Sequence, residues 1–214
     1  MPHLWPLDLR ERDIRLRPLR RRDRRAYDHL RDHDRDWLQP WEATDPDSRR
    51  RRVDFPVIRR TAEAQGRTGV ALTLAVLNRG VLVGQIAASP ILYGAASSAT
   101  LGYWIGREHA GHGTAPRAVA LLVDHLFAEL GLHRIEVNIR PENGASLRVA
   151  AKLGLREEGL RERFLHVDGQ WRDHRSFALT SEEVPPGPDG RRLRRRLDAL
   201  DRLGAQDGPD TPAQ

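Results

Sequence analysis

The residues with the clearest chemical potential are the glycines Gly111 and Gly113, which stand immediately before a long amphipathic segment. Apolar residues recur in that segment at three- and four-residue spacing, which predicts a helix over residues 114–130. The first backbone N–H groups of a helix have no intrahelical acceptor, and the helix dipole makes that end positive. Glycines also let the backbone approach a ligand closely. The junction therefore predicts an anion site suited to phosphate or pyrophosphate.

The spacing of these glycines excludes two common phosphate-binding motifs. The dinucleotide fingerprint G-x-G-x-x-G needs a third glycine where Pro116 stands, and the P-loop needs a Gly-Lys-Ser or Gly-Lys-Thr ending. A simple tight turn would explain a Gly-x-Gly pair equally well. The pair alone does not identify the anion.

A second polar group follows the next expected strand. Asn143 and Ser146 stand one helical turn apart, where the chain leaves an alternating strand at 134–139 for a short helix that ends at Gly154. Asparagine is favoured as a helix N-cap at such a position, and a serine there can bond to its own backbone. The spacing also lets the amide and the hydroxyl share one helix face and meet a ligand together.

The elements that must position these residues form a mixed α/β pattern. Alternating apolar residues predict a strand around residue 14–17, and the turns Asn78-Arg79-Gly80 and Asp168-Gly169 predict two hairpins. The expected strands cover residues 14–17, 70–77, 81–88, 99–106, 134–139, 157–167 and 171–180. The expected helices cover residues 20–34, 50–64, 114–130 and 145–154. The order is β-α-α-β-β-β-α-β-α-β-β.

The composition indicates a globular chain with room for one buried domain. Its 214 residues are 39% hydrophobic and 31% charged, with a formal net charge of +6. The absence of cysteine excludes a disulfide scaffold and thiol chemistry and suits a reducing compartment. The N-terminal segment has no hydrophobic core of signal-peptide type, and no apolar run approaches the roughly 20 residues that span a bilayer. We expect a cytoplasmic location.

The end of the chain differs in composition from the rest. After Pro185 it becomes rich in proline and glycine, then basic, then low in complexity. We therefore expect a domain over residues 1–183 and a tail over 184–214, with a helix at 190–204 in the tail. That helix places leucines along one face, at Leu193, Leu197, Leu200 and Leu203. The face could pack on the domain or on a second subunit, or the arginines around it could contact RNA.

The pattern as a whole resembles the Gcn5-related N-acetyltransferase (GNAT) superfamily, and most of all its RimJ/RimL branch, the ribosomal-protein-alanine N-acetyltransferases. The cofactor motif of the superfamily, Q/R-x-x-G-x-G/A, reads Glu108-His109-Ala110-Gly111-His112-Gly113 here, with glutamate in the first place. Strings typical of the branch are LQPWE at 38–42, LGYWIG at 101–106, IRPENGASLRVAAKLGLREEG at 139–159 and DGQWRDH at 168–174. They follow in the branch's order over about residues 10–180.

The resemblance implies an acetyltransferase fold, a mixed α/β sheet whose two central parallel strands splay apart, with acetyl-CoA as the cofactor. The pantetheine arm would pair with the strand before the glycine turn, and the pyrophosphate would lie over the amides of the turn. The residues expected to bind the cofactor are Tyr103, Trp104, Ile105, Gly106, His109, Ala110, Gly111, His112, Gly113, Thr114, Asn143, Ser146 and Arg148. The surroundings of the two histidines supply no ligand set, so no metal site is expected.

Catalytic roles also follow from the resemblance. Ser146 would protonate the departing thiolate of coenzyme A, because no tyrosine follows Tyr103 in the chain to take that role. Glu42 is the expected general base, since its loop should border the acceptor site, although a solvated loop carboxylate explains it equally well. Glu136 is a second choice. His174 is expected to satisfy a strand-end hydrogen bond rather than to act in catalysis.

The expected acceptor is a primary amine, most simply the N-terminal α-amine of a protein such as a ribosomal protein. An α-amino group with a pKa of about 7.7–8.0 is roughly a tenth deprotonated at pH 7, whereas a lysine at about 10.4 is below a thousandth. Attack would be direct, in a ternary complex. Two alternatives stay open: a small amine such as an antibiotic, polyamine or amino acid, and a non-catalytic protein of this fold that binds ribosomes or RNA. Ribosome association is an open partner, a membrane is not expected, and the choice between monomer and homodimer is open.

Overall fold

An eight-stranded mixed sheet organises the chain. The computed structural model, which describes residues 5–47 and 53–206, orders the strands β1-β2-β3-β4-β5-β6-β8-β7. The strands are β1 (Leu9–Glu11), β2 (Ile14–Pro18), β3 (Leu72–Asn78), β4 (Val81–Leu92), β5 (Ser98–Ile105), β6 (Arg134–Ile139), β7 (Arg156–Val167) and β8 (Gln170–Thr180). Neighbouring strands are antiparallel, except that β5 and β6 run parallel. This is the mixed α/β sheet that the sequence predicts.

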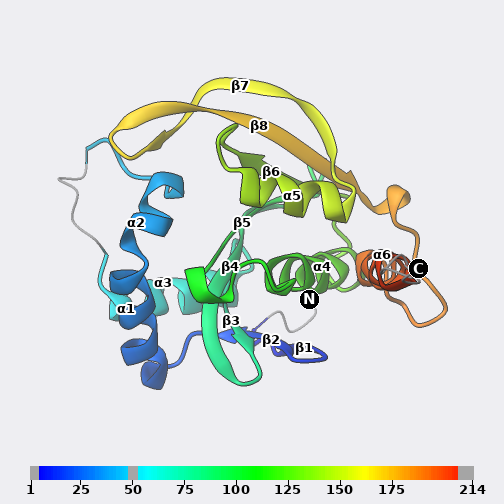
Figure 1. Ribbon diagram of the computed structural model, residues 1–214, viewed down its shortest axis with the longest axis horizontal. Helices are drawn as coiled ribbons and strands as arrows, with labels where there is room; N and C mark the ends of the chain where they lie inside the picture. Colours follow the sequence, from blue (N-terminus) through cyan, green and yellow to red (C-terminus); the bar gives the residue numbers. More distant parts are fainter. Residues whose placement is uncertain (1–4, 48–52, 207–214) are drawn as a thin grey trace, which may run out of the picture.

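Helices cover both faces of the sheet. They are α1 (Arg24–His33), α2 (Arg35–Leu38), α3 (Phe55–Thr68), α4 (Thr114–Ala128), α5 (Gly144–Leu153) and α6 (Leu193–Gln206). Figure 1 shows α1 and α3 on one side of the central strands and α4 and α6 on the other. Within the described residues, no helix is long and apolar enough to cross a membrane.

Alternate side chains of β3 pack into two hydrophobic clusters, one on each face of the sheet. Leu72, Leu74 and Val76 belong to the large cluster under α4, whereas Ala75 and Leu77 belong to a smaller cluster under α1 and α3. Successive side chains of a strand point to opposite faces of the sheet, so a strand covered on both faces must be apolar throughout. Helix α4 is the most deeply buried helix for the same reason, because it packs between the sheet and α6.

The two predicted hairpin turns are confirmed. Arg79 and Gly80 both have positive φ angles, at 50° and 83°, and they join β3 to β4 as a two-residue turn. Asp168 and Gly169 join β7 to β8 in the same way. The predicted order omits β1, which has only three residues and pairs with β2, and α2, which has only four. Of the helix expected at 50–64, residues 50–52 lie outside the described residues, and the observed helix α3 begins later, at Phe55, and ends later, at Thr68.

The described residues after 183, which end at residue 206, pack on the same core as the rest of the chain. Val184, Leu193 and Leu197 are buried in the large cluster, and α6 runs beside α4. Leu200 is 42% exposed, and the side chain of Leu203 lies outside the described residues. Asp124 of α4, itself 3% exposed, anchors the start of α6 by accepting hydrogen bonds from the backbone N–H of Leu193 and from Nε of Arg194.

Candidate active site

The parallel strands β5 and β6 separate partway along their length. Their pairing runs from Ser98 opposite Arg134 to Leu101 opposite Val137, yet β5 continues to Ile105 and β6 continues to Ile139. Beyond Leu101 the facing edges of the two strands are no longer bonded to each other. The sheet therefore opens into the V-shaped gap that the resemblance implies.

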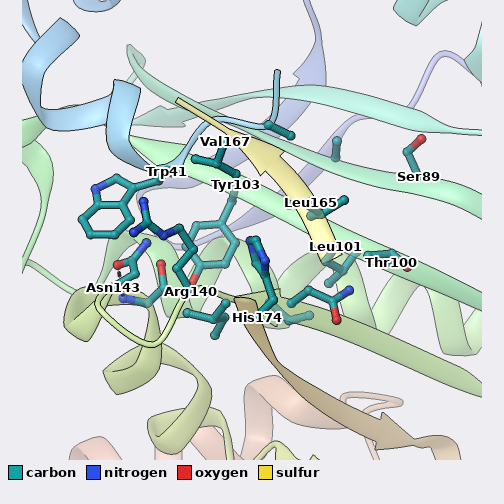
Figure 2. A pocket seen from close by; sticks show the side chains of 17 residues that line it. Trp41, Ser89, Thr100, Leu101, Tyr103, Arg140, Asn143, Leu165, Val167 and His174 are labelled. Atoms are coloured by element: carbon teal, nitrogen blue, oxygen red, sulfur yellow. Dashed lines mark hydrogen bonds between the residues drawn. The ribbon is translucent and has the colours of Figure 1, made fainter. Parts of the chain in front are cut away.

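A cavity of about 370 Å³ lies at this gap. Figure 2 shows the side chains around it, which come from β5, β6, the start of α5, the β7–β8 hairpin and the loop after α2. It is lined by Trp41, Ala43, Ala87, Ser89, Thr100, Leu101, Gly102, Tyr103, Val137, Asn138, Ile139, Arg140, Asn143, Ser146, Leu165, Val167 and His174. The structure thus brings three of the residues expected to bind the cofactor to one cavity: Tyr103, Asn143 and Ser146.

The glycine turn lies open in front of α4. Gly111 and Gly113 have φ angles of 81° and 75°, and a Cβ built at either position would meet no atom within 4 Å. Gly113 is the N-cap residue of α4 and supplies no side-chain cap, so the first amides of the helix are not satisfied by a capping side chain. Positive φ favours glycine, and the empty space beside it can accept a phosphate. The turn therefore offers space and helix-terminal amides to an anionic group.

Basic side chains surround this turn. His109 and His112 border a cavity of about 640 Å³ that Arg12, Arg79 and Arg117 also line. On the other side, Gly111 and Gly113 border a cavity of about 600 Å³ together with Arg117 and Lys152. Both cations are paired with Asp201 of α6, and Lys152 Nζ lies 2.9 Å from its carboxylate. Asp198 pairs with Arg12 and Arg117, and Asp13 pairs with Arg79, so these carboxylates compete with any anionic ligand for the positive charge.

Asn143 performs the capping role expected of it. Its Oδ1 accepts a hydrogen bond of 3.0 Å from the backbone N–H of Ser146, in the first turn of α5. This bond fixes the side-chain amide, so that Nδ2 stays available to donate to a ligand in the cavity. Capping and ligand contact are therefore compatible at this residue.

Ser146 has a partner that the sequence did not indicate. The Tyr103 side chain, from β5 on the other arm of the gap, lines the same cavity wall as Ser146. Burial raises the pKa of Tyr103 to about 12, and the nearby Ser146 hydroxyl opposes that rise. A phenol with this pKa keeps its proton at neutral pH. The pair therefore presents two neutral hydroxyl groups, either of which can pass a proton onward.

The strand before the glycine turn is partly engaged in other contacts. The carbonyl of Ile105 accepts a bond of 3.1 Å from the Trp37 indole, and the N–H of Gly106 donates to Val83. The Trp104 ring packs edge-on against Tyr27, away from the gap. Of the stretch expected to pair with pantetheine, the part nearest Tyr103 borders the cavity.

The two carboxylates expected to act as bases do not line the cavity. Glu42 forms a two-pronged ion pair with Arg31, whose guanidinium lies 5.4 Å from the centre of the Trp104 ring. Glu136 accepts from Arg134 and from Arg161. The arginine partners occupy the carboxylate oxygens that a base would turn toward the amine. The geometry therefore favours positioning roles for both residues.

The loop after α2 forms a roof over the cavity. Ala43 makes an isolated antiparallel bridge with Val167, and the N–H of Thr44 donates to the carbonyl of His166 at 2.8 Å. Arg140 holds the other end, because its guanidinium donates to the carbonyl of Pro40 at 2.7 Å and lies 5.4 Å from the Trp41 ring centre. Arg140 thus holds the loop after α2 in place over the cavity. Arg148 is exposed and remains a proposed phosphate contact.

A splayed parallel strand pair followed by an open glycine turn and a helix N-terminus defines an acyl-CoA-binding acyltransferase fold. Comparison with known proteins identifies the family. Residues 13–156 match the family model described as the acetyltransferase (GNAT) domain. The chain belongs to this family, whose enzymes are acetyl-CoA-dependent N-acetyltransferases.

Several relatives lie in the ribosomal-protein branch. A solved structure of Mycobacterium smegmatis RimJ in complex with CoA-disulfide is 38% identical, covers 92% of this chain and 96% of its own, and has a TM-score of 0.83. The [ribosomal protein uS5]-alanine N-acetyltransferase of Escherichia coli is 34% identical over 106 residues, or 50% of this chain and 55% of its own. The probable N-acetyltransferase YjcK of Bacillus subtilis is 37% identical over 102 residues, or 48% of this chain and 56% of its own. The chain thus spans about half the length of the curated relatives it matches.

Proposed function

We propose that the chain transfers an acetyl group from acetyl-CoA to a primary amine, and that this amine is the N-terminal α-amino group of a protein. The observation that carries the proposal is the coincidence of three features at one gap: unpaired strand edges, an open glycine turn, and the hydroxyl pair of Ser146 and Tyr103. Acetyl-CoA is the second substrate. Its pantetheine arm would enter the gap and its pyrophosphate would lie over Gly111 to Thr114.

Several residues of the cavity would have separate roles in a direct acetyl transfer. Asn143 Nδ2 would donate to the pantetheine arm or the acetyl group, and backbone N–H groups at the splayed strand would polarise the thioester carbonyl. As the amine nitrogen bonds to the carbonyl carbon, the carbon–sulfur bond breaks and the thiolate leaves. Ser146 would give the thiolate a proton and recover one from Tyr103.

The charges around the cavity support a protein N-terminus over a polycationic small molecule. A polyamine site needs carboxylates that are free to meet several ammonium groups. In the acidic stretch after α1, Asp36 is paired with Arg107 and Glu42 with Arg31. The Escherichia coli relative named as a [ribosomal protein uS5]-alanine N-acetyltransferase supports the same choice.

The ion pairs of the arginines near the start of α6 argue against the alternative of a non-catalytic protein that binds ribosomes or RNA. Arg191 and Arg194 at the start of α6 are held by intramolecular pairs, with Glu11 as a shared partner. These guanidinium groups are not presented as an open basic surface. Ribosome association and a cytoplasmic location stay predictions.

The proposal is tested by acetyl-CoA turnover, corrected for hydrolysis, against N-terminal peptides, lysine peptides and small amines. We expect transfer to N-terminal peptides, and loss of turnover in Ser146→Ala while acetyl-CoA still binds. Transfer to none of the acceptors, together with salt-sensitive RNA binding, would favour the non-catalytic reading.

A further inference from the structure

His174 is a buried titratable group to which the proposed mechanism has so far given no role. It lies in β8, is 4% exposed, and lines the same cavity as Ser146 and Tyr103. Figure 2 shows its side chain among the labelled residues around the cavity. The strand-end hydrogen bond predicted for it is present, because Nδ1 lies 3.0 Å from the carbonyl oxygen of Arg172.

This bond determines which nitrogen can act as a base. A carbonyl oxygen can only accept, so the proton of the bond must be on Nδ1 of His174. In a neutral ring the lone pair is then on Nε2. In the described part of the chain, Nδ1 is the ring atom that bonds to protein, which leaves Nε2 to a substrate. The ring is also held in place by an edge-on contact with Phe164, at 6.0 Å between ring centres.

The surroundings keep the ring neutral. Burial lowers the pKa of His174 below its ordinary value of 6.5, and the bond to the Arg172 carbonyl opposes this shift. Arg140 lowers this pKa further, while Asp173 and Glu142 raise it. Arg161 is the cross-strand neighbour on β7, and its guanidinium is bonded to Glu136. At neutral pH the ring is therefore an uncharged acceptor in the cavity wall.

We propose that His174 is the general base that removes a proton from the attacking amine through Nε2. This inference rests on the proposed acetyl transfer and assigns to His174 the role that was expected of Glu42. Both Glu42 and Glu136 lie off the cavity wall and are bonded to arginines, whereas His174 is on that wall.

The proton balance closes with this assignment. A neutral amine nitrogen bonds to the thioester carbon, gains positive charge, and loses one proton to Nε2 of His174. The carbon–sulfur bond breaks, and the thiolate takes one proton from Ser146. The products are an N-acetyl amide and coenzyme A with a free thiol. His174 then releases its proton to solvent, and solvent returns one proton to the hydroxyl pair, so no further reactant is needed.

His174→Asn separates catalysis from structure. The Asn side-chain N–H can occupy the place of Nδ1 and keep the bond to Arg172, while the lone pair of Nε2 is lost. We expect kcat to fall by about 100- to 10,000-fold, with little change in KM for acetyl-CoA or in Tm. His133→Asn is the matched control, because His133 is exposed and pairs with Glu182 away from the cavity. It should leave kcat unchanged.

Two further readouts distinguish a base from a packing residue. The kcat of the wild type at saturating acceptor should fall as the pH drops through the pKa of His174, and His174→Asn should lose this limb. In His174→Ala, added imidazole should restore part of the rate. If His174→Asn keeps its rate and its acid limb while the wild type acetylates N-terminal peptides, the base assignment is wrong and the proposed function stands. If the wild type binds acetyl-CoA but acetylates nothing, both fail.

Discussion

Replacing Asn143 tests whether one side chain caps a helix and holds a ligand at the same time. Asn143→Ala removes the acceptor of the bond from the Ser146 N–H. Loss of such a cap costs about 1 kcal/mol of unfolding free energy, or about 2–4 °C in Tm for a chain of this length. Asn143→Ser keeps a capping oxygen and should therefore keep Tm close to that of the wild type.

Both substitutions remove the Nδ2 donor, so they should affect acetyl-CoA alike. A neutral hydrogen bond contributes about 0.5–1.5 kcal/mol, which corresponds to about a 2- to 13-fold weaker Kd. Thermal unfolding and calorimetric titration of the three proteins measure the two effects separately. If Asn143→Ser binds acetyl-CoA like the wild type, Asn143 is only a cap. If Asn143→Ala leaves Tm unchanged, the capping argument itself is refuted.

Three more changes should have distinct outcomes. Asp201→Asn should free Lys152 and leave Arg117 paired with Asp198 alone, which should tighten acetyl-CoA binding by a few-fold. Glu63→Gln, which frees two arginines on α3, should not, and equal affinities of the Asp201→Asn variant and the wild type in calorimetry would contradict this. Burial lowers the pKa of both His125 and His174, so the unfolded chain binds more protons than the folded chain as the pH falls below about 6.5. The Tm should therefore fall from pH 7 to pH 5, and a Tm that does not change over this range would refute the lowered pKa values. Asp124→Ala removes the carboxylate that holds the start of α6, and it should lower the unfolding free energy by about 3–5 kcal/mol, as measured by urea titration. A loss below about 1 kcal/mol would show that Asp124 does not anchor α6.

Local patterns in the sequence predict most of the fold. The hairpin turns, the alternating strands and the long apolar helix after Gly113 each depend on residues close together in the chain. The element β1 escapes prediction because three residues give no period, and its place is set by pairing with Ile14 to Leu16. The helix α6 is visible from its leucines, but its docking depends on Asp124, about 70 residues earlier.

The residues of the candidate site also divide into those that local sequence patterns predict and those that depend on tertiary contacts. The open turn at Gly111 and Gly113 and the helix cap at Asn143 are predictable because they depend on local backbone geometry. The direction of the Glu42 side chain is not predictable from the sequence, because the carboxylate is bonded to Arg31 through a tertiary contact. The contact between Tyr103 and Ser146 joins two elements on either side of the gap, and no spacing in the sequence encodes it. The same holds for His174, whose place in the cavity wall depends on how β8 pairs with β6.

The central claim is that the glycine turn and the splayed strands bind acetyl-CoA. Calorimetric titration with acetyl-CoA tests it most directly, using the wild type and Gly113→Ala. Positive φ disfavours alanine there, and its Cβ would project into the open space proposed for the phosphate. The account predicts one-to-one binding by the wild type and at least about tenfold weaker binding by a folded Gly113→Ala, a difference of about 1.4 kcal/mol. No heat of binding from the wild type, or equal affinity of the two proteins, would contradict it.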